Sequence, residues 1–270
     1  MAAATDAAPD VLARHNVVVR GSGRPIVFAH GFGCSQAMWR YVAPEFEADH
    51  QVVLFDYVGA GGADTSSYRP GKYDSLEGYA SDVLEIIEAL DLHDVVFVGH
   101  SVSTMVGVLA ANRDPSRFGR LVLVSPSPRY IDDEDYVGGF QRQDIEDLLD
   151  SLDANYVGWS ETMAPIIMGN PDRPDLGQEL TDSFCRYDPA IARQFARVTF
   201  LSDHRRDLAA VTIPTDIIQC DEDVIAPMAV GRFVHEHIRG SSFTVIPVSG
   251  HVPNLSAPAE VTAAIKAALR

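Results

Sequence analysis

The sequence predicts an α/β protein with a mostly parallel, doubly wound sheet and an inserted helical cap. Apolar runs rich in β-branched residues alternate with helical patterns along most of the 270 residues, which is typical of a parallel sheet covered on both faces. Between Pro126 and Pro214 no apolar run is convincing as a strand. That interval is far longer than a strand-to-helix connection needs. We therefore expect it to fold as helices over the carboxyl edge of the sheet.

Short, nearly continuous apolar runs are expected to form buried strands. They cover residues 25–30, 51–56, 94–100, 120–126, 215–220 and 242–250. An earlier run at 16–20 alternates less clearly and leads into the turn sequence GSG at 21–23. We interpret it as an edge strand in a hairpin.

Helical patterns separate these runs, with apolar residues spaced three and four apart. In the core they cover residues 76–90, 102–112, 228–238 and 259–269. In the cap they cover 131–156, 157–168, 178–187 and 189–201. The predicted organisation is a flexible N-terminal tail at 1–15, a core made of 16–126 and 213–270, and a cap at 127–212.

Composition and charge exclude several classes of protein. The chain is 46% hydrophobic and 22% charged, which is ordinary for a globular protein. Its formal net charge of −17 repels phosphate backbones and anionic membranes, so we expect neither nucleic acid nor membrane as a partner. No apolar stretch is long enough to span a membrane, and the first residues lack the features of a signal peptide.

Cysteine and histidine usage argues against metal and disulfide chemistry. Cys34, Cys185 and Cys220 are scattered and form no C-x-x-C pair, which argues against a zinc ribbon or a disulfide framework and favours the cytoplasm. His235 and His237 lie two positions apart in a helical pattern, so they do not share a face. We expect no metal and no cofactor.

The strongest motif lies where a buried strand gives way to a helix, at Gly99-His100-Ser101-Val102-Ser103. A nucleophile elbow, G-x-S-x-G, lifts a serine hydroxyl out of a sheet at such a junction. Small residues flank the serine because strand and helix nearly touch there, and the second glycine is replaced here by Ser103. The alternative is a serine that simply caps a buried helix.

A serine hydroxyl needs a base and an orienting acid to become nucleophilic. Asp221, Glu222 and Asp223 follow the next-to-last predicted strand, and His251 follows the last one in a glycine-containing loop. Both loops are expected at the same sheet edge as Ser101. This pattern makes His251 the candidate base and leaves three carboxylates open.

An oxyanion hole is the remaining requirement, with backbone N–H groups directed at the developing charge. The sequence His30-Gly31-Phe32-Gly33 follows the first long predicted strand and is similar to the loop that supplies one such donor in α/β-hydrolases. The N–H groups of Phe32 and Val102 are therefore the candidate donors.

Dinucleotide binding is the competing explanation for the glycine-rich segments. A G-x-G-x-x-G fingerprint could begin at residues 31–33 or 59–61, but Gln36 and Asp64 occupy the third glycine position. The chain also contains no P-loop lysine motif and no H-E-x-x-H.

Together these motifs resemble the α/β-hydrolase superfamily. The segments HGFGCSQAMW, FDYVGAG, GHSVS, IIQCDEDVIAP and SGHVPNLS further resemble the RsbQ-like family, which includes a bacterial stress-response regulator and the plant strigolactone and karrikin receptors. The resemblance runs from about residue 16 to the C-terminus.

This resemblance implies a role for each matched position. Ser101 would be the nucleophile, Asp223 the acid and His251 the base, with oxyanion donors as named above. The cap would cover a small apolar pocket lined by Phe140, Trp159 and Phe200, although each aromatic could equally be ordinary cap packing.

The expected function is a carboxylesterase-like serine hydrolase that acts on a small apolar ester or lactone through an acyl-enzyme. The resemblance also implies an RsbQ-like regulator in a stress response, with a PAS-type protein phosphatase as partner. A free-standing carboxylesterase, or a cofactor-free C–C hydrolase or perhydrolase, are the alternatives. Dehalogenase and epoxide hydrolase chemistry is disfavoured because those relatives carry aspartate at the position of Ser101.

Overall fold

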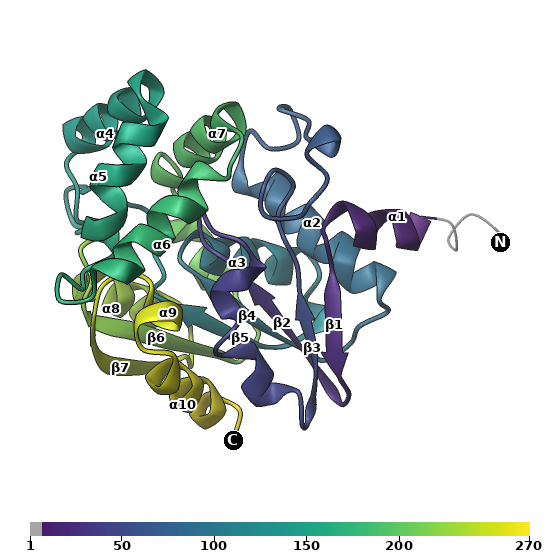
Figure 1. Cartoon of the computed structure of the whole chain (residues 1–270). Helices are drawn as coiled ribbons and strands as arrows, with labels where there is room; N and C mark the ends of the chain where they lie inside the picture. The colour runs from purple at the N-terminus through teal and green to yellow at the C-terminus, as the bar shows by residue number, and fades with distance from the viewer. Residues whose placement is uncertain (1–6) are drawn as a thin grey trace.

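A seven-stranded sheet forms the centre of the computed structural model, which describes residues 7–270 (Figure 1). The strand order is β1-β3-β2-β4-β5-β6-β7, and every neighbouring pair is parallel except β1 and β3. The expected mostly parallel sheet is confirmed. The strands are β1 (Val18–Gly21), β2 (Arg24–Ala29), β3 (His50–Leu54), β4 (Val95–His100), β5 (Phe118–Val124), β6 (Thr215–Glu222) and β7 (Ser242–Ser249).

The predicted hairpin at the first strand is wrong. Strand β1 pairs antiparallel with β3, and β3 separates it from β2. Both edges of β2 are occupied, because it pairs in parallel with β3 on one side and with β4 on the other. The turn at 21–23 therefore leads from β1 to β2 across the position that β3, a later segment of the chain, occupies between them.

Apolar residues that alternate along the strands build a core on each face of the sheet. Val27 of β2, Val53 of β3 and Phe97 of β4 lie in register and belong to one cluster. Their strand neighbours Ile26 and Val52 belong to the cluster on the opposite face. The sheet is thus buried on both sides, which explains why its strands have nearly continuous apolar sequences.

Helices cover both faces and so make the sheet doubly wound. On one face lie α2, α3 and α8, and on the other α10 and the short 3-10 helices η1 and η2. Their bounds are α1 (Ala7–Arg14), α2 (Leu76–Ala89), α3 (Val102–Arg113), α8 (Met228–His237), α9 (Pro253–Ser256), α10 (Pro258–Ala268), η1 (Gln36–Trp39), η2 (Ala43–Phe46), η3 (Thr65–Ser67), η4 (Pro115–Arg117) and η5 (Arg205–Ala210).

Helix α1 corrects the flexible tail that the sequence predicts at 1–15. It packs against α2 (Figure 1), the Arg14 guanidinium pairs with the Glu85 carboxylate, and His15 is fully buried. The segment from residue 7 onward is therefore part of the fold. Residues 1–6 lie outside the described part of the chain.

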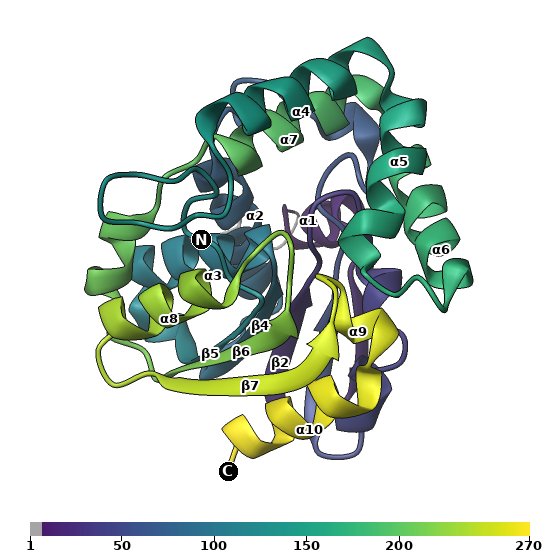
Figure 2. The same ribbon diagram turned by 90° about the vertical axis from the view of Figure 1, so that its left-hand side faces the viewer.

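Four helices form the cap over the carboxyl ends of the strands (Figures 1 and 2). They are α4 (Arg142–Ala154), α5 (Tyr156–Met168), α6 (Pro174–Cys185) and α7 (Pro189–Phe200). Local caps define where they begin: Asn155 accepts a hydrogen bond from the Gly158 N–H, and Asp188 does the same for Ala190 and Ile191.

The first cap helix begins eleven residues later than the sequence predicts. Ile131 and Phe140 form an isolated bridge, and the Asp132 carboxylate accepts hydrogen bonds from the N–H groups of Gly138 and Gly139. This closed loop replaces helix because the two glycines are poor helix formers. No helix within residues 7–270 has the length and apolarity of a membrane span.

Candidate active site

Ser101 occupies a strained turn between β4 and α3. Its φ is 56°, a conformation that non-glycine residues rarely adopt, and its N–H donates to the Val124 carbonyl at 2.9 Å. A Cβ atom at Gly99 would lie 2.6 Å from the Ser103 carbonyl oxygen, so only glycine fits there. Strand and helix therefore approach as closely as a nucleophile elbow requires.

The structure brings Ser101, His251 and Asp223 together. The His251 Nε2 and Ser101 Oγ atoms are 2.7 Å apart, and His251 Nδ1 lies 2.7 Å from the Asp223 carboxylate. All three side chains are buried. Ser101 follows β4, Asp223 follows β6 and His251 follows β7, so the three meet because parallel strands end at one edge of the sheet.

The geometry also distinguishes among the three candidate acids. One Asp223 oxygen accepts hydrogen bonds from the N–H groups of Ile225 and Ala226, at 2.9 and 3.0 Å. Burial alone would raise the pKa of Asp223, but His251 and these two donors outweigh burial and hold that pKa below its ordinary value. Asp221 and Glu222 are exposed. Only Asp223 is placed to face the imidazole as a carboxylate.

The predicted oxyanion donors lie beside the elbow. Phe32 belongs to the loop after β2, and Val102 is the first residue of α3, where backbone N–H groups have no partner within the helix. Ser103 ties these elements together, because its hydroxyl donates to the His30 carbonyl at 2.5 Å and contacts the Tyr57 hydroxyl at 2.8 Å. The serine that replaces the motif's second glycine thus anchors the loop that carries Phe32.

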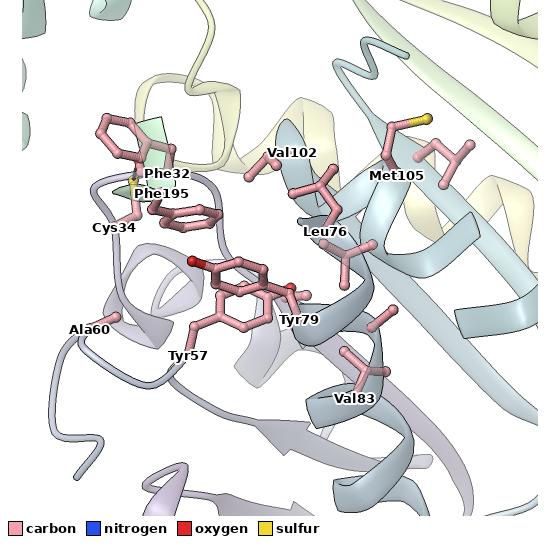
Figure 3. Packing of buried hydrophobic residues seen from close by; sticks show 14 of the residues in the cluster. Phe32, Cys34, Tyr57, Ala60, Leu76, Tyr79, Val83, Val102, Met105 and Phe195 are labelled. Atoms are coloured by element: carbon pink, nitrogen blue, oxygen red, sulfur yellow. Dashed lines mark hydrogen bonds between the residues drawn. The ribbon is translucent and has the colours of Figure 1, made fainter. Parts of the chain in front are cut away.

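Aromatic packing supports the same loop from below (Figure 3). The Phe32 ring meets Phe195 edge-on at 5.6 Å between centroids, and Phe195 stacks on Tyr79 at 4.4 Å. Phe195 comes from the cap helix α7 and Tyr79 from the core helix α2. The position of Phe32 is therefore fixed jointly by the cap and the core.

His100 links the elbow to the loop of the candidate base. Its Nε2 lies 2.6 Å from the carbonyl oxygen of His251, so the imidazole donates to the backbone of the candidate base. Burial, together with the nearby His251, lowers the pKa of His100 to about 3. The ring is therefore neutral at ordinary pH and carries its proton on Nε2.

A narrow apolar cavity lies over Ser101. Its volume is about 30 Å³, which exceeds the roughly 10–15 Å³ that one water molecule needs. Of the three predicted pocket residues, only Phe200 lines this cavity. The other lining residues are Gly31, Phe32, Cys34, His100, Ser101, Tyr130, Ile167, Leu180, Phe184, Thr199, Ile225, His251 and Val252.

Phe140 and Trp159 do not line the cavity, which corrects two of the predicted pocket positions. Both border a groove between α4 and α5. Trp159 stacks on Phe184 with a centroid distance of 5.6 Å, and Phe184 lines the cavity. Phe184 thus takes the place that the sequence analysis gave to Trp159.

Tyr130 and Phe184 are the principal cavity residues that the sequence analysis missed. Burial raises the pKa of the Tyr130 hydroxyl, and a hydrogen bond with the Ser101 side chain opposes that shift. Tyr130 follows β5, so the rule that strand ends meet at one edge could have identified it. Phe184 lies within α6, and no local pattern marks it as facing Ser101.

A group of potential metal ligands lies away from this site. His15, Asp82 and Glu85 place ligand atoms within 4.8 Å of one another. The Lys72 ammonium already lies 2.6 Å from Asp82 and 2.9 Å from Glu85, so a side-chain cation neutralises the carboxylates. We assign no metal to this cluster.

The chain is similar to known proteins over most of its length. A family model described as the alpha/beta hydrolase family matches residues 26–265. The karrikin insensitive 2 receptor IA of Petunia hybrida is 40% identical over 248 residues, which cover 91% of this chain and 90% of the relative. A strigolactone esterase of Arabidopsis thaliana is 37% identical over 262 residues, covering 96% of this chain and 98% of the relative.

A solved structure shows the same similarity in three dimensions. A hydrolase from Oleispira antarctica superposes with a TM-score of 0.94 at 40% sequence identity, and the match covers 96% of both chains. Similarity of this extent includes the cap as well as the sheet.

Proposed function

The chain belongs to the alpha/beta hydrolase family, and from that premise we propose that it is a serine hydrolase for a small apolar ester or lactone. The observation that carries the proposal is the continuous hydrogen-bond chain from Ser101 through His251 to Asp223, with 2.7 Å at each step. This is the arrangement in which a neutral imidazole can take the serine proton while a carboxylate fixes its tautomer.

In the proposed reaction, Ser101 Oγ attacks the substrate carbonyl carbon and its proton moves to His251 Nε2. The carbonyl oxygen becomes an oxyanion that accepts hydrogen bonds from the N–H groups of Phe32 and Val102. Collapse of this intermediate breaks the ester C–O bond, and His251 returns its proton to the departing alkoxide. Water then attacks the acyl-enzyme with His251 as base, which releases the acid and restores Ser101.

The cavity narrows the class of substrate. Its walls are almost wholly apolar, and its free space beside Ser101 is about 30 Å³. A short acyl group fits with little adjustment, whereas a bulky one requires Phe184 or Phe200 to move. We therefore expect acetate esters and small lactones to react faster than esters of long-chain acids.

The test is hydrolysis of a short-chain aryl ester together with labelling by a fluorophosphonate. Wild-type protein should turn over the ester and carry the label on Ser101, and Ser101→Ala should lose both. Removal of a triad nucleophile costs about 10⁶-fold in kcat in a well-studied serine protease. Unchanged turnover by purified Ser101→Ala protein would refute the proposal.

We also propose a second role, an RsbQ-like regulator whose hydrolase site senses its ligand. Its support is the receptor named among the relatives at 40% identity. The partner proposed from the family resemblance is a PAS-type protein phosphatase, and the proposed location is the cytoplasm, where reduced thiols such as Cys34 and Cys220 persist. In a reconstituted assay, wild-type protein should activate that phosphatase and Ser101→Ala should not; equal activation by both would contradict a role for the triad.

A further inference from the structure

The cap touches the loop of the candidate base through backbone atoms. The N–H of His251 donates to the Ile167 carbonyl in the last turn of α5, at 2.9 Å. A Cβ atom at Gly169 would lie 2.8 Å from the Gly250 Cα, and one at Gly250 would lie 1.9 Å from the Met168 carbonyl oxygen. The end of α5 and the loop from 249 to 251 therefore pack with no side chain between them.

Asn170 joins the two segments with its side-chain amide. Its Nδ2 donates to the Met168 carbonyl at 2.6 Å and to the Ser249 carbonyl at 3.1 Å. The last carbonyls of a helix have no partner within that helix, and Gly169 ends α5 in the left-handed conformation. One amide group thus satisfies a carbonyl of the cap and a carbonyl of the loop, two residues before His251.

We propose that Asn170 is a positioning residue that holds the His251 loop against the end of α5 and so keeps the imidazole in line with Ser101. The inference deepens the hydrolase function proposed above and rests on it. Asn170 lies outside the elbow, acid and oxyanion motifs and touches none of the reacting groups.

Two hydrogen bonds hold the backbone of His251 itself. Its carbonyl oxygen is held from the core by His100 at 2.6 Å, and its N–H is held from the cap by Ile167. The cap side of this clamp depends on where the end of α5 lies relative to the loop, and Asn170 sets that distance. A displacement of about 1 Å at reacting groups can cost 10²-fold in rate.

The decisive comparison uses one substitution at the two ends of one helix. Asn170→Asp removes the amide donors and places a carboxylate beside two carbonyl oxygens. Asn155→Asp makes the same charge change at the start of α5, where the side chain only accepts a hydrogen bond from Gly158 and aspartate caps equally well. Asn170→Ala removes the donors without adding charge, and Asn170→Gln restores an amide.

We expect Asn170→Asp and Asn170→Ala to lower kcat for an aryl acetate by between about 10-fold and 10²-fold with little change in KM. Asn155→Asp should match wild type, and Asn170→Gln should recover part of the loss. In proton NMR spectra, the resonance of the His251 Nδ1 proton should be sharp in wild type and Asn155→Asp and broadened by exchange in Asn170→Ala. That spectrum reports imidazole position without any turnover.

Each outcome distinguishes this inference from the function on which it rests. If wild-type protein hydrolyses esters but Asn170→Asp and Asn170→Ala keep its kcat, pH profile and NMR signal, the positioning role is wrong. A lowered melting temperature with unchanged kcat would likewise reduce Asn170 to a helix cap. If wild-type protein has no esterase activity, the proposed function fails, and the NMR comparison still decides whether Asn170 holds His251.

Discussion

Replacement of Asp223 by asparagine isolates the contribution of one proton position to catalysis. In the structure, one Asp223 oxygen accepts hydrogen bonds from the N–H groups of Ile225 and Ala226, and the other faces His251 Nδ1 at 2.7 Å. The asparagine oxygen can keep the two backbone donors. Its NH₂ group then faces His251, and Nδ1 must accept a hydrogen bond from it through a lone pair. The imidazole proton moves to Nε2, and the ring can no longer accept the proton of Ser101.

The expected loss in kcat for an aryl acetate is about 10⁴-fold, as for the equivalent change in a serine protease, or about 5 kcal/mol in activation free energy. KM should change little because Asp223 does not line the cavity. Asp221→Asn is the matched control, since Asp221 is exposed two positions earlier. A similar loss in Asp221→Asn, or a loss below tenfold in Asp223→Asn, would refute the tautomer argument.

Two further predictions concern the cavity wall and acid stability. Phe184→Ala should raise the ratio of butyrate to acetate hydrolysis and lower the free energy of unfolding by about 3–5 kcal/mol. Trp159 lies behind Phe184, so Trp159→Ala should be similarly destabilising but keep a hydrolysis ratio closer to that of wild type. Equal ratios in the two variants would contradict this arrangement. Because the pKa of Asp223 lies below its ordinary value, its ionised form contributes stability that is present above the unfolded-state pKa of about 3.9 and is lost as pH falls through the folded-state pKa. Urea midpoints measured from pH 6 to pH 3 should therefore fall less steeply in Asp223→Asn than in wild type, and parallel curves would contradict it.

The sequence predicted the sheet well because buried parallel strands have a distinctive pattern. The run at residues 95–100 is buried at every position and is apolar up to Gly99, and glycine-containing turns separate such runs from the helices. Which strands pair is harder to predict, because a strand from later in the sequence can lie between two consecutive strands. The hairpin expected at 16–23 failed for that reason: β3, which begins at His50, lies between β1 and β2.

The candidate site likewise contains residues that the sequence could predict and residues that it could not. Residues at strand ends, such as Ser101 and His251, were predictable because topology alone brings them to one edge. Cavity residues from the cap were not, since α5 and α6 could rotate about their axes without any change in local sequence pattern. A different rotation would place Trp159 instead of Phe184 at the cavity wall, so only the packed structure decides between them.

The distance along the chain between Ser101 and His251 has a consequence for how the protein matures. The two residues that share a hydrogen bond lie 150 positions apart, and β7, which precedes His251, is the edge strand that completes the sheet. At synthesis rates of about 5–20 residues per second, the nucleophile leaves the ribosome's catalytic centre about 8–30 s before its base exists. On the proposed mechanism, Ser101 has no base during that interval and should not attack an ester. If the proposed mechanism holds, we expect esterase activity only after β7 has docked, and none from a chain truncated before β7.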